Sequence, residues 1–309
     1  MAAVGHSIEE IAARMETLGI WEPMLRWNWA ICPAGSVLPY FCTLLKGDGA
    51  LVRMRLLLLV GWQTFHDFMR GRADPNWGCY SSPMELPHLE LVFPVSGMPR
   101  FFRHAPGYMP VEASADNRAL GERLLWQVLG LMMRLETDPK LPLRFAGEQA
   151  IFARIEKPDG NWEDAPLALV EPRPYVENVA LSKDDLRVAK DLVMAKDDIV
   201  DVDFRMLPGL MTKETPPRCC YELLAVEASG GREVVRARVS ISPDGGLKGL
   251  WESVPGQLLK ALVRRGRFPG EIRVRSGRLF RLLRGLCTEL PFRLSLHENL
   301  PTLVKISVQ

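Results

Sequence analysis

The sequence predicts an α+β protein of two domains, and three observations support this prediction. Apolar runs joined by short Gly- and Asp-rich turns indicate antiparallel hairpins in the N-terminal part. Apolar stripes at helical spacing indicate helices that pack on the resulting sheet. Beyond about residue 219, strands and helices alternate, which is typical of a smaller mixed sheet. A chain of 309 residues, 47% of them hydrophobic and 25% charged, is long enough for both domains.

The N-terminal part opens with a helix, which a hairpin follows. Ser7 and Glu10 form a capping box, and the apolar spacing after them predicts a helix over 8–18. Extended runs at 37–45 and 50–60 flank a Lys-Gly-Asp-Gly turn, so we expect them to pair. These elements predict a sheet that is antiparallel at its start.

The rest of this part alternates helices and strands. The same reasoning predicts helices at 62–70 and 115–136, and strands at 88–93, 149–156 and 165–171. We expect a loop over 71–83, and residues 94–110 hold too many prolines and glycines to predict regular structure. The first domain is therefore expected to be an antiparallel sheet with packed helices, spanning residues 1–207.

Prolines separate this domain from the next one. Three prolines in ten residues mark 208–218 as a linker, with residues 219–309 as the second domain. A helix at 183–195 and a connecting strand at 199–206 precede the linker. The second domain is expected to contain strands at 221–228, 233–241, 271–275 and 292–296, and helices at 253–265 and 276–287.

The order of elements in the second domain partly resembles a ribonuclease-H-like core, although only two opening strands are evident where that core has three. Four segments of this domain resemble an uncharacterised bacterial two-domain family: residues 269–275, 279–286, 292–296 and the closing 300–303. Residues 103–110 before Ser114 are similar to the N-terminal domain of that family. The resemblance implies a fold and carries no activity to any residue.

Positive charge is concentrated at the C-terminal end. Residues 230–309 carry a net charge of +9, whereas residues 1–229 carry −7. Eight arginines are candidates for anion binding: Arg264, Arg265, Arg267, Arg273, Arg275, Arg278, Arg281 and Arg284. Because arginine binds phosphate and carboxylate through a planar fork, these residues either contact nucleic acid or another polyanion, or dock on the acidic N-terminal part.

Metal and catalytic motifs are incomplete. Asp197, Asp198, Asp201 and Asp203 form an acidic cluster, which we interpret as a solvated rim because a strand here would place Asp198 opposite the last two. Glu227 is the one candidate for a nuclease-type metal ligand, but two-metal cleavage needs further converging carboxylates. The five histidines are scattered and the six cysteines form no C-x-x-C pair. We therefore expect no metal, no cofactor and free thiols.

These observations favour a non-catalytic intracellular protein that acts in binding or assembly. The alternative is a protein that binds nucleic acid, or a metal-dependent nuclease-like protein, that uses the basic C-terminal domain. No run of residues is apolar enough to span a membrane, and the N-terminus lacks the features of an export signal. We therefore expect the protein to be located in the cytoplasm.

Overall fold

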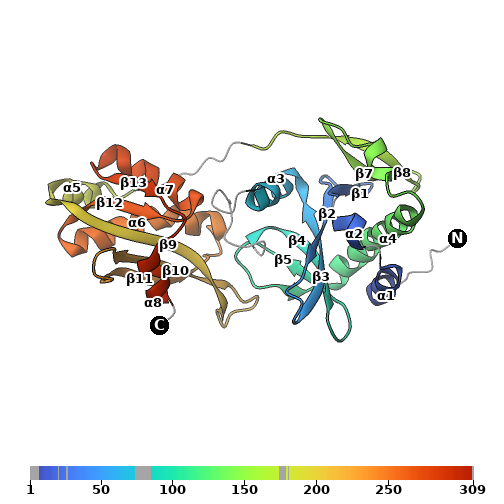
Figure 1. Cartoon of the computed structure of the whole chain (residues 1–309), viewed down its shortest axis with the longest axis horizontal. Coiled ribbons are helices and arrows are strands. Elements are labelled where there is room, and N and C mark those ends of the chain that lie inside the picture. The colour runs from blue at the N-terminus through green and yellow to red at the C-terminus, as the bar shows by residue number, and fades with distance from the viewer. Residues whose placement is uncertain are drawn as a thin grey trace. The chain divides into compact units, whose positions relative to one another are not determined.

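The computed structural model describes residues 7–19, 21–25, 27–73, 85–173, 179 and 181–307. These residues form helices and two sheets, which confirms the α+β class (Figure 1). The chain forms two compact units. Unit 1 comprises residues 1–66, 86–105 and 110–173, and unit 2 comprises residues 67–85, 106–109 and 174–309. Most of the loop predicted at 71–83 lies outside the described residues.

Unit 1 is built on an eight-stranded sheet in the order β6-β5-β4-β3-β2-β1-β7-β8. Its strands are β1 (Trp29–Cys32), β2 (Tyr40–Lys46), β3 (Val52–Val60), β4 (His88–Pro94), β5 (Arg100–His104), β6 (Val111–Glu112), β7 (Ala150–Glu156) and β8 (Trp162–Ala168). Neighbouring strands are antiparallel, except that β1 and β7 pair in parallel. Pro166 lies in β8, an edge strand, where the sheet tolerates a missing backbone donor.

Helices cover both faces of this sheet. α1 (Ile8–Leu18), α2 (Trp21–Leu25) and α4 (Ala115–Thr137) contribute to one continuous apolar core with the side chains of one face. α1 begins at the predicted capping box and ends at Gly19, whose φ of 65° is left-handed. On the other face, Phe65 of α3 (Gly61–Ala73) stacks on Phe41 with ring centroids 4.3 Å apart.

One strand of unit 1 contradicts the prediction for residues 94–110. This segment contains β5, which pairs with β4 and places His104 opposite His88. The strand is five residues long between breakers, so its local pattern is weak, and pairing with β4 stabilises it. Residues 141–144 form a 3-10 helix after α4.

Unit 2 is built on a five-stranded sheet in the order β11-β10-β9-β12-β13. Its strands are β9 (Met194–Met211), β10 (Cys219–Glu227), β11 (Glu233–Ser240), β12 (Phe268–Val274) and β13 (Arg293–Leu296). The first three strands pair antiparallel, and β12 and β13 continue the sheet in parallel with β9. The sheet is mixed, as predicted, with three antiparallel strands in place of two.

The extra strand moves the boundary between the two parts of the chain. β9 runs through residues 208–211, the start of the predicted linker, and pairs with both β10 and β12. Unit 2 therefore takes up the chain from residue 174, not from 219. Of the prolines that suggested a linker, Pro208 lies in β9 at the register irregularity between the paired residues Met206 and Met211, where a missing donor matters little, and Pro216 and Pro217 lie between β9 and β10.

Helices flank this sheet too. α6 (Gly246–Arg265) and α7 (Gly277–Glu289) form one core with the sheet, which α5 (Lys183–Asp191) joins through Ala189. α8 (Pro301–Ser307) packs on the opposite face through Leu303. α6 begins seven residues earlier than predicted and contains Pro255, which is buried with the apolar side chains around it. Among the described residues, no helix has the length and apolar character needed to cross a membrane.

Candidate functional site

The Arg265 side chain holds two carboxylates at the end of the unit 2 sheet. Its guanidinium lies 2.6 Å from Asp198 of β9 and 2.6 Å from Glu227 of β10, and only 9% of the side chain is exposed. Arg267 adds a second contact to Glu227 at 3.0 Å. Burial acts to raise the pKa of Glu227, but hydrogen bonds from both arginines hold it below its ordinary value. Glu227 therefore stands in an ion-pair network with two guanidinium groups.

Three further arginines of the predicted anion-binding set also have partners inside unit 2. Arg275 contacts Asp203 at 2.6 Å, and Arg273 contacts Glu271 at 3.3 Å. The buried Arg278 lies over the ring of Trp251, 4.1 Å from its centroid. Although the C-terminal part of the sequence is basic, these arginines pair with nearby groups of the same unit, because residues 174–309 supply both the arginines and many of the acids.

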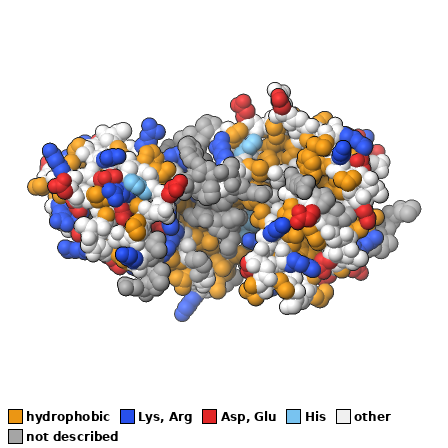
Figure 2. All heavy atoms as spheres, in the orientation of Figure 1, with side chains coloured by type: hydrophobic (Ala, Val, Ile, Leu, Met, Phe, Trp, Pro, Cys, Tyr) orange, Lys and Arg blue, Asp and Glu red, His pale blue; other side chains and the backbone are white. Residues whose placement is uncertain are grey.

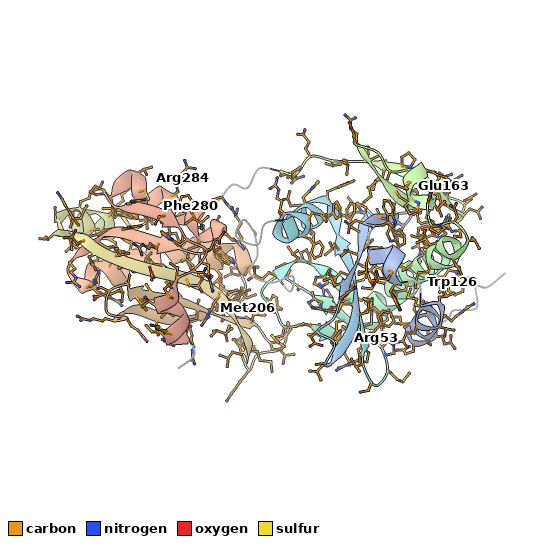
Figure 3. The ribbon with its side chains drawn as sticks, in the orientation of Figure 1. Arg53, Trp126, Glu163, Met206, Phe280 and Arg284 are labelled. Atoms are coloured by element: carbon orange, nitrogen blue, oxygen red, sulfur yellow. The ribbon has the colours of Figure 1, made fainter. Side chains whose placement is uncertain are left out.

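The remaining members of the set differ in their exposure to solvent. Arg264 and Arg284 are exposed, and Arg281 is half-buried. Figure 3 shows Arg284 on α7, near Phe280. On the face of the protein drawn in Figure 2, basic and acidic side chains are interspersed over the described surface of unit 2.

Most of the acidic cluster is not a solvated rim, which corrects the prediction for three of its four aspartates; Asp197 is exposed as predicted. Asp201 and Asp203 are buried, at 2% and 5% exposure, and Asp198 is paired with Arg265. As the strand period predicts, Asp201 and Asp203 share a face of β9, opposite the apolar core. Burial raises the pKa of Asp201, against the nearby charges of Arg273 and His297.

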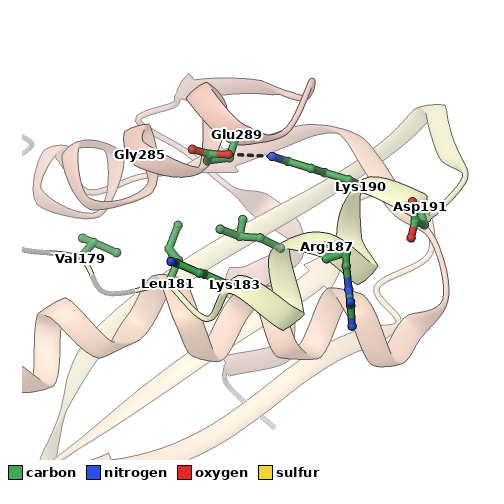
Figure 4. A pocket seen from close by; sticks show the side chains of 9 residues that line it. Val179, Leu181, Lys183, Arg187, Lys190, Asp191, Gly285 and Glu289 are labelled. Carbon is green, nitrogen blue, oxygen red and sulfur yellow. Dashed lines mark hydrogen bonds and ion pairs between the residues drawn. The ribbon is translucent and has the colours of Figure 1, made fainter.

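A pocket of about 730 Å³ opens between α5 and α7 (Figure 4). Its apolar part consists of Val179, Leu181 and Leu186, which also pack against the core of unit 2. Charged side chains form the rest of the lining together with Gly285: Lys183, Arg187, Lys190, Asp191 and Glu289. The volume lies in the range of pockets that hold small molecules.

Helical spacing places three cations at this pocket. Lys183, Arg187 and Lys190 recur at intervals of four and three residues along α5, so they lie on one stripe. Lys190 reaches across to Glu289 of α7 at 2.8 Å, as Figure 4 shows. On the α7 side, a Cβ atom built on Gly285 would meet nothing within 4 Å, so this glycine leaves the pocket open.

A buried polar cluster lies in the sheet of unit 1. His88 and Glu90 are two residues apart on β4 and therefore share a face, and His104 of β5 lies directly opposite His88. The two imidazole rings stack with centroids 3.9 Å apart and an interplanar angle of 15°. Nε2 of His104 lies 2.6 Å from a Glu90 oxygen, and the Arg55 guanidinium pairs with the same carboxylate.

The environment fixes the charges of this cluster. Burial, and next the neighbouring His104, lower the pKa of His88 to about 3, so its ring is neutral near pH 7. Burial opposes ionisation of Glu90, but hydrogen bonds from His104 and Arg55 outweigh it and lower the pKa to about 2. Sequence reasoning missed this cluster because β5 was not predicted. The alternation of His88 and Glu90 on a strand was the available signal.

Comparison with known families identifies part of unit 2. Residues 185–307 match a domain of unknown function, DUF6930. The match runs from the third residue of α5 to the end of α8, and includes the lining residues of the α5–α7 pocket from Leu186 onward. No curated protein matches the chain. The wider bacterial two-domain family stays a prediction from the sequence motifs.

Proposed function

We propose that this protein is a non-catalytic binding protein, and that the α5–α7 pocket of unit 2 binds a small anion with an apolar body. The observation that carries this proposal is the composition of the pocket, in which an aliphatic surface adjoins three cationic side chains. An apolar group is driven into such a pocket by burial of its surface, while cations at the rim select a carboxylate, sulfonate or phosphate.

The ion pairs of the lining support an anionic ligand. Lys190 is engaged by Glu289, and Arg187 contacts Asp184 only at 3.7 Å on an exposed surface, where such a pair is weak. Lys183 is exposed and forms no ion pair with another described residue. Two cations are thus available to a ligand that enters beside Leu181 and Leu186.

We place this activity in the cytoplasm as part of the proposal. The described cysteines, Cys32, Cys42, Cys219, Cys220 and Cys287, are free thiols, which suits a reducing compartment.

Filling the pocket at Gly285 tests the proposal. The probe is 1-anilinonaphthalene-8-sulfonate, an anion with an aromatic body, titrated by its fluorescence into the folded protein. Gly285→Phe should weaken probe binding by about tenfold or more, because the ring occupies the open space that the glycine leaves. The matched control Gly285→Ala should bind the probe nearly as the wild type does, and it favours the helix by about 0.5–1 kcal/mol.

Charge removal provides the second arm of this test. Lys183→Gln combined with Arg187→Gln should weaken binding of the probe and reduce its dependence on salt. Thermal unfolding of each variant shows whether probe fluorescence reports the native state, since partly unfolded proteins also bind this dye. Equal affinities of the wild type and Gly285→Phe would exclude the pocket as the binding site.

The alternative is that unit 2 binds nucleic acid or another polyanion. It is supported by the exposed Arg264 and Arg284 and by the charges of residues 174–309, where 22 lysines and arginines face 17 aspartates and glutamates. Binding of a DNA duplex that weakens by orders of magnitude between about 50 and 200 mM salt, and further in Arg284→Gln, would favour it. Metal-dependent cleavage of the duplex that Glu227→Gln abolishes would overturn the non-catalytic proposal.

A further inference from the structure

We propose that His88, Glu90 and His104 of unit 1 bind one first-row transition-metal ion, of which Zn²⁺ is the first to test. These three side chains each offer a ligand atom, and the three atoms lie within 4.8 Å of one another. The site is separate from the α5–α7 pocket, and the proposal does not depend on the function proposed for that pocket.

The donor set selects the class of ion. Two imidazole nitrogens and one carboxylate oxygen suit Zn²⁺ and Fe²⁺, whereas Mg²⁺ and Ca²⁺ prefer oxygen ligands alone. Zinc sites with three protein ligands leave a fourth position for water or substrate.

Unpartnered buried atoms point to a missing ligand. His88 and His104 are 1% and 3% exposed, yet Nε2 of His88 and Nδ1 of His104 have no hydrogen-bond partner among the residues that the structure describes. A buried polar atom without a partner is uncommon, because desolvation costs about 1–3 kcal/mol that no bond offsets. A metal bond to a ring nitrogen, with the rings turned to share the ion, would remove part of this cost.

The geometry needs only a small adjustment. Tetrahedral zinc with bonds of about 2.1 Å holds its ligand atoms about 3.4 Å apart, so atoms now up to 4.8 Å apart would close in by no more than about 1.4 Å. If Nε2 of His104 is a ligand atom, it would move about 0.8 Å away from the Glu90 oxygen that it now contacts at 2.6 Å. Antiparallel pairing of β4 and β5 already fixes the backbones of both histidines. Arg55 opposes binding, since its guanidinium neutralises Glu90 and would lie close to the ion.

Metal titration of the full chain tests the proposal. Protein stripped with a chelator is titrated with Zn²⁺ and separately with Co²⁺, both in the native state and by refolding with the metal present, because the site is buried. Bound metal is counted by mass spectrometry. Co²⁺ held by nitrogen and oxygen gives visible d–d bands without the near-ultraviolet band of thiolate ligands, which distinguishes this site from the free cysteines.

The variants make the result specific. His88→Gln and His104→Gln should each lower affinity on the order of 100-fold or more, beyond what loss of an outer-shell contact costs. The matched control is His66→Gln on α3, a half-buried histidine of the same unit whose Nε2 contacts the carbonyl of Val170. It should bind one metal ion, as the wild type does.

The variant Arg55→Gln distinguishes a metal-binding site from a polar cluster with a structural role only. Removing one positive charge near a doubly charged ion should raise affinity on the order of tenfold, the Coulomb energy at about 6 Å in a water-like dielectric. Arg55 is 31% exposed, so this variant also serves if the histidine variants fail to fold. The proposal is overturned if the wild type binds no stoichiometric metal after refolding, if both histidine variants bind like the wild type, or if Arg55→Gln does not bind more tightly.

Discussion

Replacement of Arg265 by methionine should destabilise unit 2 by about 3 kcal/mol. Arg265 contacts Asp198 and Glu227, each at 2.6 Å, and these carboxylates are each only 12% exposed. Methionine keeps the apolar stem but leaves the two negative charges without their shared partner. Loss of one partner of a buried pair costs about 3–5 kcal/mol, and Arg267 stays 3.0 Å from Glu227, which places the cost at the lower end.

Calorimetry and urea unfolding measure this effect. For a unit of this size, about 3 kcal/mol corresponds to a fall of about 6–12 °C in the melting temperature. The matched control is Arg264→Met, one residue earlier on α6, where the exposed side chain should change stability by less than about 0.5 kcal/mol.

Carboxylate neutralisation should rescue the loss. Adding Asp198→Asn and Glu227→Gln to Arg265→Met removes the unpaired charges, so the triple variant should recover at least half of the lost stability. The reasoning fails if Arg265→Met is no less stable than Arg264→Met, or if the triple variant is less stable than Arg265→Met alone.

Two further predictions concern pH and packing. The pKa of Glu227 in the folded protein lies below the ordinary 4.5, so its stabilisation is fully present above about pH 4.5 and is lost as pH falls through the folded pKa. The stability difference between wild type and Glu227→Gln in urea should therefore shrink on acidification, and a constant difference from pH 7 to pH 3 would contradict this. Gly121→Ala on α4 would place a Cβ atom 2.5 Å from the Phe101 ring, and this overpacking should destabilise unit 1 by about 1–3 kcal/mol. A gain of about 1 kcal/mol in helix propensity offsets part of that loss. A Cβ atom at Gly130 of the same helix would meet nothing within 4 Å, so Gly130→Ala should stabilise the protein by up to about 1 kcal/mol. Equal unfolding midpoints of Gly121→Ala and Gly130→Ala would refute the packing argument.

The candidate sites differ in how many of their residues and contacts could be predicted from the sequence. The arginines of 264–284 were recognised by composition, yet their partners were not, because Asp198 and Asp203 lie about 70 residues away from Arg265 and Arg275. The α5–α7 pocket joins residues about 100 positions apart, as the Lys190–Glu289 contact shows. Spacing along one helix can place cations on a stripe, but it cannot identify the helix that faces them.

Local interactions determined the elements that the sequence predicted. The capping box at Ser7, the turn after Lys46 and the apolar stripe of α4 each act within a few residues, and the structure contains all three. Tertiary structure alone decided that β5 pairs with β4, that β9 extends to residue 211, and that His88 and His104 meet. The physical reason is that strand register and burial depend on contacts distant in sequence, whose free energy outweighs weak local preference.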